Sequence, residues 1–456
     1  MDEIRALAPT GMLGSGYSER SLKTAMGWSP DFIACDAGST DLGPSYLGTG
    51  NCQFSHPAIK RDLRLMLLAA RQAKVPLIVG SAGTAGGDLN LAWALNIVRE
   101  IAKEEDLHFR MGVVHAEQDK AYLKTRLRQG RVRALQPAPL LNEEVIDRSA
   151  HIVGMMGPEP ITAALEQGAE VVIAGRSSDT SLFAAIPIAR GFPEGLVWHA
   201  AKILECGAAC VAVRNAPDCM VAIIRQDSFV VEPPAPELWC TPQSVASHTL
   251  YENADPFHLY ECGGMLDTSE AQYSAISDRA VRVSGSQWVP ATTYTVKLEG
   301  AELAGYQSVV VGSMRDPIII RQVHDWLARL RDRLAVRIGE AFGGLKMDVD
   351  YSVFFRIYGL NGTMGALEPV ETPAHEICLF MEVTAGDQAL ATAIAESAHH
   401  LAAHHPVPEW HGLITGLAFP YSPGVLVRGP VYRFNMNHLV EPDDPYQMFP
   451  TDIESL

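Results

Sequence analysis

Hydrophobic and polar positions alternate along the first 200 residues in a pattern that predicts short buried strands separated by helices. The strands are runs rich in Val, Ile and Ala, each bounded by Gly, Asp or Ser. The five expected strands are residues 31–35, 76–80, 111–115, 151–156 and 170–174. Strands that alternate with helices favour a parallel sheet covered on both faces. We therefore predict an α/β domain over residues 1–215, with a doubly wound and mostly parallel sheet.

The pattern changes after Arg214. Residues 216–300 contain Pro233, Pro234 and Pro236 and several short strand-like runs, so we expect a β-rich region packed on the first domain. Two loops in this region, residues 251–257 and 261–267, combine polar and aromatic side chains that are suited to lining a cleft.

The last third, residues 301–456, has its own order of elements. A strand and a helix are followed by two strands, a helix and further strands, and this β-α-β-β-α-β order predicts a ferredoxin-like α+β domain. The expected strands are residues 308–314, 351–358, 376–384, 414–419 and 431–439, and the expected helices are residues 317–338 and 387–405.

Composition narrows the class of protein. The chain has 456 residues and a formal net charge of -17, which argues against binding nucleic acid or an anionic membrane surface. No apolar run reaches the roughly 18 residues of a membrane span, and no signal-peptide pattern is present, so we expect a cytoplasmic protein. The eight cysteines are scattered and are expected to be reduced thiols.

Metal binding has weak support in the pattern. His400 and His404 are spaced i, i+4 on one predicted helix between His399 and His405, a geometry that a metal could use. No Glu follows His400 as in HExxH, and a half-exposed helix end explains the group better. The sequence requires no cofactor and leaves a divalent metal open.

Polar loops follow the predicted strands, and the carboxyl ends of parallel strands are where ligands bind in such sheets. Arg176 and Asp179 follow the strand at 170–174, and Asp36 follows the strand at 31–35. We predict Asp36, Arg176 and Asp179 as catalytic, the arginine as an anion anchor and the aspartates as acid or base. The expected substrate-binding side chains are Ser15, Arg20, Ser39, Ser81, Thr84, Ser177, Ser178 and Asn361. The structural alternative is that these residues cap helices, and that Arg176 and Asp179 only pair with each other.

Several segments resemble one family. The motifs GRSSDTSLF (175–183), LECGA (204–208), GSAGTAGGD (80–88), YGLNGT (358–363) and YRFNMNHLV (432–440), with an early GSGYSER…PDFIACDAGS, resemble the acyclic terpene utilisation AtuA family, formerly a domain of unknown function. The resemblance implies catabolism of a carboxylic acid or its thioester. It also implies a small partner protein and a homo- or hetero-oligomer. Family members typically show Gly-x-x-Gly-Asp-Arg at the first loop, where this chain has Gly16-Tyr17-Ser18-Glu19-Arg20, so only Arg20 carries over.

These observations favour an enzyme, a lyase of the hydratase or dehydratase type that acts on a small carboxylate or its CoA thioester. In this hypothesis Arg176 holds the carboxylate, Asp36 or Asp179 moves the proton, and N–H groups of residues 81–87 stabilise an enolate. One alternative is acyl or amide hydrolysis by Ser177 or Ser178, with His199 or His115 as base. Another is a non-catalytic subunit that binds an organic acid or acyl-CoA for a partner enzyme.

Overall fold

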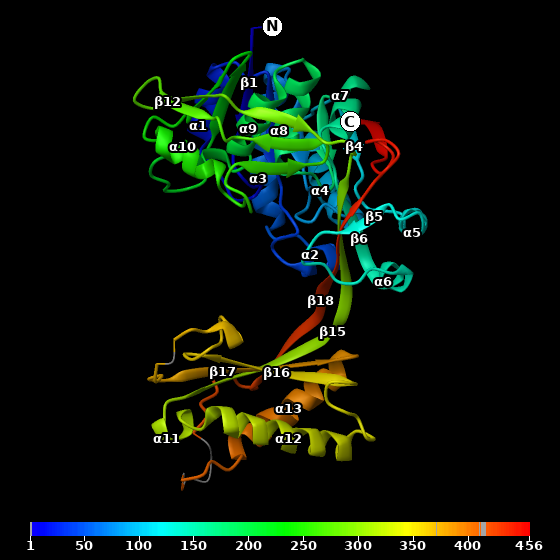
Figure 1. The fold of residues 1–456 in the computed structure, drawn as a ribbon, viewed down its shortest axis with the longest axis vertical. Coiled ribbons are helices and arrows are strands. Elements are labelled where there is room, and N and C mark those ends of the chain that lie inside the picture. Colours follow the sequence, from blue (N-terminus) through cyan, green and yellow to red (C-terminus); the bar gives the residue numbers. More distant parts are fainter. Residues whose placement is uncertain (1, 371, 410, 412–415) are drawn as a thin grey trace. The chain divides into compact units, whose positions relative to one another are not determined.

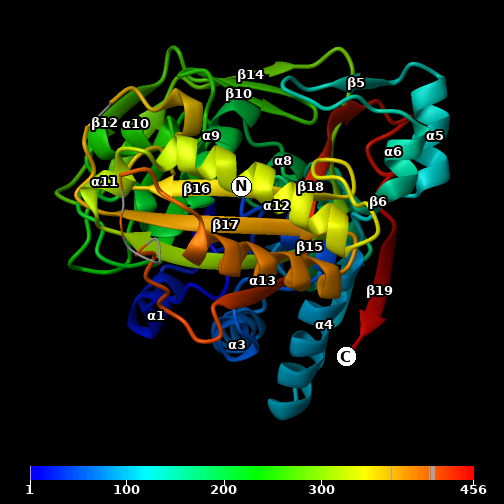
Figure 2. The ribbon, with the colours of Figure 1, turned by 90° about the horizontal axis from the view of Figure 1, so that it is seen from below.

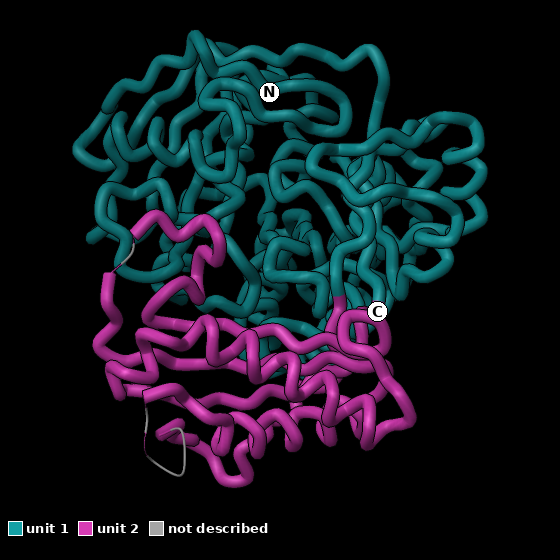
Figure 3. Tube along the Cα trace, turned by 60° about the horizontal axis from the view of Figure 1, so that its bottom comes forward, with its two compact units in different colours: residues 1–302, 433–456 teal, residues 303–432 magenta. Residues whose placement is uncertain are grey.

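A computed structural model describes residues 2–370, 372–409, 411 and 416–456, and it divides the chain into two compact units (Figure 3). Unit 1 comprises Met1–Glu302 and Arg433–Leu456, and unit 2 comprises Leu303–Tyr432. Residues 216–300 belong to unit 1 because their strands extend its main sheet. The end of the chain also returns to unit 1, where β19 (Thr451–Ser455) pairs with β4 (Arg110–Val114). The sequence had instead placed a boundary at residue 215 and grouped the chain end with the last domain.

Unit 1 is built on a ten-stranded mixed sheet in the order β12-β13-β9-β8-β1-β2-β3-β7-β4-β19. Its five central strands are parallel: β1 (Glu3–Ala8), β2 (Phe32–Asp36), β3 (Leu77–Gly80), β7 (Val171–Ala174) and β4. The flanking strands are antiparallel: β8 (Met220–Arg225), β9 (Phe229–Glu232), β13 (Val281–Ser284), β12 (Gln272–Ala275) and β19. The expectation of an α/β protein with a large, mostly parallel or mixed sheet is confirmed.

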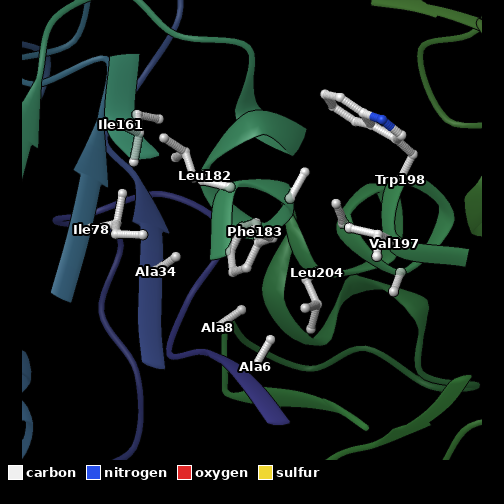
Figure 4. Close-up of a cluster of buried hydrophobic side chains, with 14 of the residues drawn as sticks. Ala6, Ala8, Ala34, Ile78, Ile161, Leu182, Phe183, Val197, Trp198 and Leu204 are labelled. Atoms are coloured by element: carbon white, nitrogen blue, oxygen red, sulfur yellow. The ribbon is translucent and has the colours of Figure 1, made fainter. Parts of the chain in front are cut away.

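Helices cover both faces of the central strands because successive strand residues point to opposite faces. On one face, Ala34 and Ile78 of β2 and β3 lie with Phe183 in a cluster formed with α7 (Glu159–Glu166), α8 (Asp179–Ala189) and α9 (Glu194–Leu204) (Figure 4). Ile33 and Leu77, the neighbours in sequence, join a second cluster with α1 (Glu19–Gly27), α3 (His56–Ala73) and α4 (Asp88–Glu104).

One predicted strand has a different place. We expected residues 151–156 in the parallel sheet, but β6 (Ser149–Met155) pairs antiparallel with β15 (Val296–Met314), so that assignment is wrong. The fifth parallel position is filled by β1, which was not predicted because its sequence EIRALA is short and carries two charges. The end of β6 nevertheless supports the loop after β7, since the Met156 N–H donates to the Arg176 carbonyl at 3.1 Å.

A small antiparallel sheet of β10 (His258–Glu261), β11 (Gly264–Asp267) and β14 (Gln287–Pro290) packs on α9. Trp198 of α9 stacks on Trp288 of β14 with ring centroids 4.9 Å apart. The remaining elements of unit 1 are α2 (Pro44–Thr49), α5 (Lys120–Arg128), β5 (Val132–Ala134), α6 (Glu143–Arg148), η1 (Gly207–Cys210) and α10 (Pro242–Thr249).

Unit 2 contains the part of β15 that follows Glu302, α11 (Pro317–Ile320), α12 (Val323–Ala341), β16 (Tyr351–Tyr358), η2 (Gly365–Leu367), β17 (Ile377–Ala385), α13 (Gln388–His404) and the part of β18 (Val425–Val440) that precedes Arg433. Its sheet order is β16-β17-β15-β18, with α12 and α13 side by side on one face (Figure 1 and Figure 2). This is the element order from which the sequence predicted a ferredoxin-like domain. Of the predicted strand at 414–419, residues 414 and 415 lie outside the described residues, and Ala418 forms an isolated bridge with Ser313.

None of the helices in the described ranges combines the length and the apolar character needed to cross a membrane.

Candidate functional site

The candidate site lies where the parallel strands of unit 1 reach their carboxyl ends. Asp36 is the last residue of β2, Ser81 directly follows β3, and Arg176 follows β7 after one glycine. Because β2, β3 and β7 are parallel neighbours, these residues meet at one edge of the sheet. Contacts confirm the convergence: Arg176 Nη1 donates to Ser81 Oγ at 3.2 Å, and the Ser177 N–H donates to the same oxygen at 3.3 Å.

A cavity of about 520 Å³ opens at this edge and is rich in charge. Its acidic lining residues are Asp41, Asp179, Glu205, Glu252 and Glu261, and its basic ones are Arg176, Lys202 and Lys297. Apolar and hydroxyl-bearing side chains complete the wall: Leu135, Met155, Ser178, Thr180, Leu259 and Tyr260. We call this hollow the acidic cavity.

The Arg176 side chain is fixed by hydrogen bonds to neighbouring protein groups. Its Nε donates to Glu299 Oε2 at 2.8 Å, its Nη1 donates to the Ser177 carbonyl at 2.9 Å, and its side chain is only 5% exposed. Lys297 lies 2.8 Å from the second oxygen of Glu299. Burial would raise the pKa of Glu299, but Arg176 and Lys297 outweigh it and lower that pKa to about 2. Asp179 is 3.7 Å from Arg176 Nη1, so the pairing that the sequence left open exists, but Glu299 is the closer partner.

Asp36, which is buried, and Asp179, whose side chain is 32% exposed, form a second group of acids. Burial raises the pKa of Asp179 to about 6, with Arg176 and Lys202 opposing the rise. Burial also raises the pKa of Asp36, and the negative charge of Asp179 adds to the effect. Asp36 Oδ2 accepts the Gly38 N–H at 2.9 Å, whereas Oδ1 is buried without a hydrogen-bond partner among the described residues. Such an orphaned oxygen favours a protonated carboxyl.

Glu261 is oriented by two hydroxyl groups at the start of α8. Its carboxylate accepts from Ser178 Oγ at 2.7 Å and also from Thr180 Oγ1. Burial raises the pKa of Glu261 to about 7, although both hydroxyls favour the ionised form. This side chain therefore changes its protonation near neutral pH.

Lys202 and Glu205 form a buried pair at the end of α9. Lys202 Nζ donates to Glu205 Oε1 at 2.6 Å, and the two side chains are 4% and 7% exposed. Burial raises the pKa of Glu205 to about 8 despite the adjacent ammonium group. Asp179, Glu261 and Glu205 thus surround one cavity with pKa values near neutrality.

The other predicted site residues lie elsewhere. Ser15 Oγ donates to the Met12 carbonyl at 2.6 Å inside its own turn, and Thr84 Oγ1 accepts the Gln53 N–H at 2.9 Å. Ser39 donates to Asp41 at 3.2 Å and does not line the cavity itself. Arg20 is exposed on α1.

Asn361 belongs to unit 2, where it lines a separate hollow of about 510 Å³. Ser15, Arg20, Ser39 and Thr84 are not among the residues that line the acidic cavity, and their binding role, like that of Asn361, stays a prediction.

The glycine-rich loop at 81–87 also has a packing role. The N–H groups of Ser81 and Ala82 donate to the carbonyls of Gly175 and Ala174 at 2.9 and 3.0 Å, so they do not face a ligand as expected. Gly86 has φ +67°, and an added Cβ would lie 2.2 Å from the Arg176 nitrogen. Residue 86 is a glycine because the backbone after β7 passes directly against it.

The histidines that the sequence paired with serines bond to other groups. His199 contacts Ser286 at 2.6 Å and Thr249 at 2.9 Å, and burial lowers its pKa to about 3. His115 contacts Asp88 at 2.8 Å. A serine–histidine pair at Ser177 or Ser178 is therefore not formed by these two residues.

The sequence did not identify several of the charged side chains at the site. Lys202 and Glu205 carried a usable signal, because charged side chains at i, i+3 among the apolar residues at the end of α9 are rarely buried unless they are paired. Glu252 and Glu261 lie in or beside the polar-aromatic loops that were expected to line a cleft, and both line the cavity. Nothing in the local sequence marked Lys297 and Glu299, which alternate along β15 with buried apolar residues.

Within the described residues, no group of three or more His, Cys, Asp and Glu side chains is placed to hold a metal ion. The rings of His400 and His404 lie 4.9 Å apart on α13, as their spacing predicted.

A model of a known protein family matches most of the chain. The family model described as acyclic terpene utilisation family protein AtuA matches residues 53–414. Neither the curated proteins nor the solved structures contain a match to the chain.

Proposed function

We propose a function from one premise: this chain belongs to the acyclic terpene utilisation family AtuA. Membership indicates a catabolic role in the use of acyclic terpenes. Within that role, the protein is a lyase that adds water to, or removes water from, a small organic acid or its thioester.

The observation that carries this proposal is the set of three carboxyl groups around the acidic cavity. The pKa values of Asp179, Glu261 and Glu205 are about 6, 7 and 8. Near neutral pH, Asp179 is mostly ionised and Glu205 mostly protonated, so a general base and a general acid are present together. Addition or elimination of water needs both.

In the hydration direction, the Asp179 carboxylate removes a proton from water as the water oxygen bonds to the β-carbon of an unsaturated acyl group. The electron pair of the double bond moves to the α-carbon and its adjoining carbonyl, and Glu205 gives its proton to the α-carbon. The proton on Asp179 returns to Glu205 through Glu261 or solvent. The reverse sequence eliminates water.

Binding of the substrate differs from the first hypothesis. Arg176 cannot offer its Nε–Nη1 edge to a carboxylate, because Glu299, Ser81 and Ser177 already occupy those atoms. Lys297 lines the cavity and its side chain is 28% exposed, so it supplies the cation for the substrate carbonyl or carboxylate. Arg176 then acts by keeping Glu299 and Asp179 in place.

The test is incubation with unsaturated and hydroxylated branched acids and their thioesters in isotopically labelled water. Wild-type protein should incorporate the label into product, and Asp179→Asn should lose it. Asp147→Asn, a change on the exposed end of α6, serves as the matched control. Turnover that survives in Asp179→Asn at the wild-type rate would remove the proposed base.

A second candidate is supported by the 2.7 Å contact between Ser178 Oγ and Glu261. A carboxylate at that distance can accept the proton of a serine nucleophile, which keeps acyl hydrolysis open with Glu261 in place of a histidine. Ser178→Ala separates the two functions: it should abolish a hydrolase and leave a lyase with altered rather than absent turnover.

A further inference from the structure

A second hollow lies beside the acidic cavity. It has a volume of about 760 Å³ and is formed by α10 and by the segment that follows η1. Its walls include Ala212, Gln243, Ser247, His248 and Tyr251. We call it the α10 groove.

The groove and the cavity share a boundary. Tyr251 lines the groove, and the next residue, Glu252, lines the acidic cavity. Lys202 of the cavity wall places its Nζ 5.5 Å from the centre of the Tyr251 ring. A molecule whose reacting end occupies the cavity can therefore extend past Lys202 and Tyr251 into the groove.

The lining of the groove differs in chemistry from that of the cavity. Gln243 and Ser247 are exposed polar side chains, and the side chains of Val211 and Ala212 are apolar. His248 is 9% exposed and stacks on Tyr251 at 5.6 Å, and its Nε2 has no hydrogen-bond partner in the part of the chain that the structure describes. The described residues that line the groove include no Asp or Glu, whereas five carboxyl groups line the acidic cavity.

Positive charge lies near this wall. Burial, together with the positive charges of Lys202 and Arg214, lowers the pKa of His248 to about 4. His248 is thus a neutral ring that can donate or accept a hydrogen bond. Arg214 is exposed and follows Ala212 of the groove wall by two residues, so it supplies a cation next to the wall.

We propose that the α10 groove binds the pantetheine arm of a thioester substrate while the acyl group occupies the acidic cavity. The arm alternates amide groups with methylene carbons, which matches a wall that mixes amide, hydroxyl and imidazole groups with apolar side chains. Its phosphate end suits Arg214 and would be repelled by the acidic cavity. The inference rests on the proposed function, since it specifies a thioester rather than a free acid as substrate.

The experiment is calorimetric titration of the full chain with coenzyme A and, separately, with pantetheine. Ser247→Trp fills the groove from an exposed position, and Ser274→Trp on the exposed side of β12 is the matched control. We expect Ser247→Trp to weaken both probes by at least about tenfold and Ser274→Trp to leave both unchanged. Equal thermal melting of the two variants shows that both fold.

Arg214→Ala distinguishes the two molecules that could carry the pantetheine arm, coenzyme A and a carrier protein. If coenzyme A is the carrier, this change weakens coenzyme A several-fold and leaves pantetheine unaffected. If the arm belongs to a carrier protein, pantetheine and coenzyme A bind the wild type equally, and Arg214→Ala changes neither.

Two results would overturn the inference: no binding of either probe at millimolar concentration, or binding that is identical in wild type and Ser247→Trp. Neither result affects the proposed lyase, because that reaction is tested independently by label incorporation in wild type and Asp179→Asn, with acids and thioesters alike. Conversely, groove-dependent binding of coenzyme A with unchanged turnover in Asp179→Asn would leave the groove in place and remove the lyase.

Discussion

Arg176 and Glu299, which are 123 residues apart in the chain, meet through a 2.8 Å hydrogen bond with each side chain only 5% exposed. The pair joins the loop after β7 to β15, and thereby fixes the guanidinium group that lies 3.7 Å from Asp179. Lys297 adds a second cation to the same carboxylate. Glu299 is therefore a positioning residue for the acidic cavity, and its loss affects both stability and turnover.

Glu299→Gln should destabilise the protein by about 3 kcal/mol, because it leaves the buried Arg176 and the nearby Lys297 without their counter-charge. Urea denaturation at neutral pH measures the loss. Glu270→Gln, at an exposed position of unit 1, is the control and should change the free energy of unfolding by less than about 0.5 kcal/mol. A loss for Glu299→Gln as small as that of the control would show that the buried pair contributes little.

The Glu299 carboxyl also predicts how the free energy of unfolding changes at acidic pH. The pKa of Glu299 is about 2 in the folded protein, lower than its ordinary value of 4.5. Its contribution to stability is therefore fully present above pH 4.5. It is lost as the pH falls from about 4.5 to about 2, because the unfolded chain binds the proton first. Melting of wild type and Glu299→Gln over this range should converge toward low pH. A constant difference between them would contradict the assignment.

Glu261 predicts that stability falls as the pH rises near neutrality, which is the opposite dependence. Its pKa of about 7 is raised above the ordinary 4.5, so stability from the protonated form is complete below 4.5 and is lost as the pH rises through 7. Glu261→Gln keeps an acceptor for Ser178 and Thr180 but cannot ionise. We expect it to match the wild type at pH 5 and to be the more stable of the two at pH 8, as thermal melts would show.

Part of this site could be predicted from the sequence. Asp36, Ser81, Arg176 and Asp179 follow strands that are parallel, and parallel strands place their carboxyl ends at one edge whatever their order. The position of Glu299 could not be predicted, because it reaches Arg176 through the antiparallel pairing of β15 with β6. The sequence of β6 contains no record of its partner, so its buried residues alone suggested a fifth parallel strand.

Functional roles were harder to predict than positions. Glycines at residues 83, 86 and 87 indicated an anion loop, but at Gly83 and Gly86 the structure uses the missing side chain for close packing of the backbone. The fork of Arg176 pointed to a substrate carboxylate, whereas Glu299 and Ser81 occupy it. In both cases the partner comes from a distant segment, and local spacing does not show whether a polar group is already bonded.

Gly86→Ala tests this packing role directly. Gly86 and Gly130 have nearly the same φ, +67° and +70°, but an added Cβ at Gly86 lies 2.2 Å from the Arg176 nitrogen and one at Gly130 meets nothing within 4 Å. Gly130→Ala should cost about 1 kcal/mol from the left-handed backbone alone. Gly86→Ala should cost clearly more and also reduce turnover, because Arg176 must shift. If urea denaturation gives equal losses in the free energy of unfolding for the two variants, the loop accommodates the added methyl group without further cost.

The pair of Lys202 and Glu205 allows function to be separated from stability. Both side chains are buried at the end of α9 and lie 2.6 Å apart, so removing one leaves the other without its partner. Glu205→Leu alone should destabilise by about 3 to 5 kcal/mol because it leaves the buried Lys202 ammonium without its acceptor, whereas the double change Lys202→Met with Glu205→Leu should be near neutral or stabilising. If Glu205 is the proton donor, the stable double variant should nevertheless lose turnover by a factor of about 10² to 10⁴. Denaturation and product formation measured on the same samples decide the matter: a double variant that is stable and fully active would reduce the pair to a structural contact.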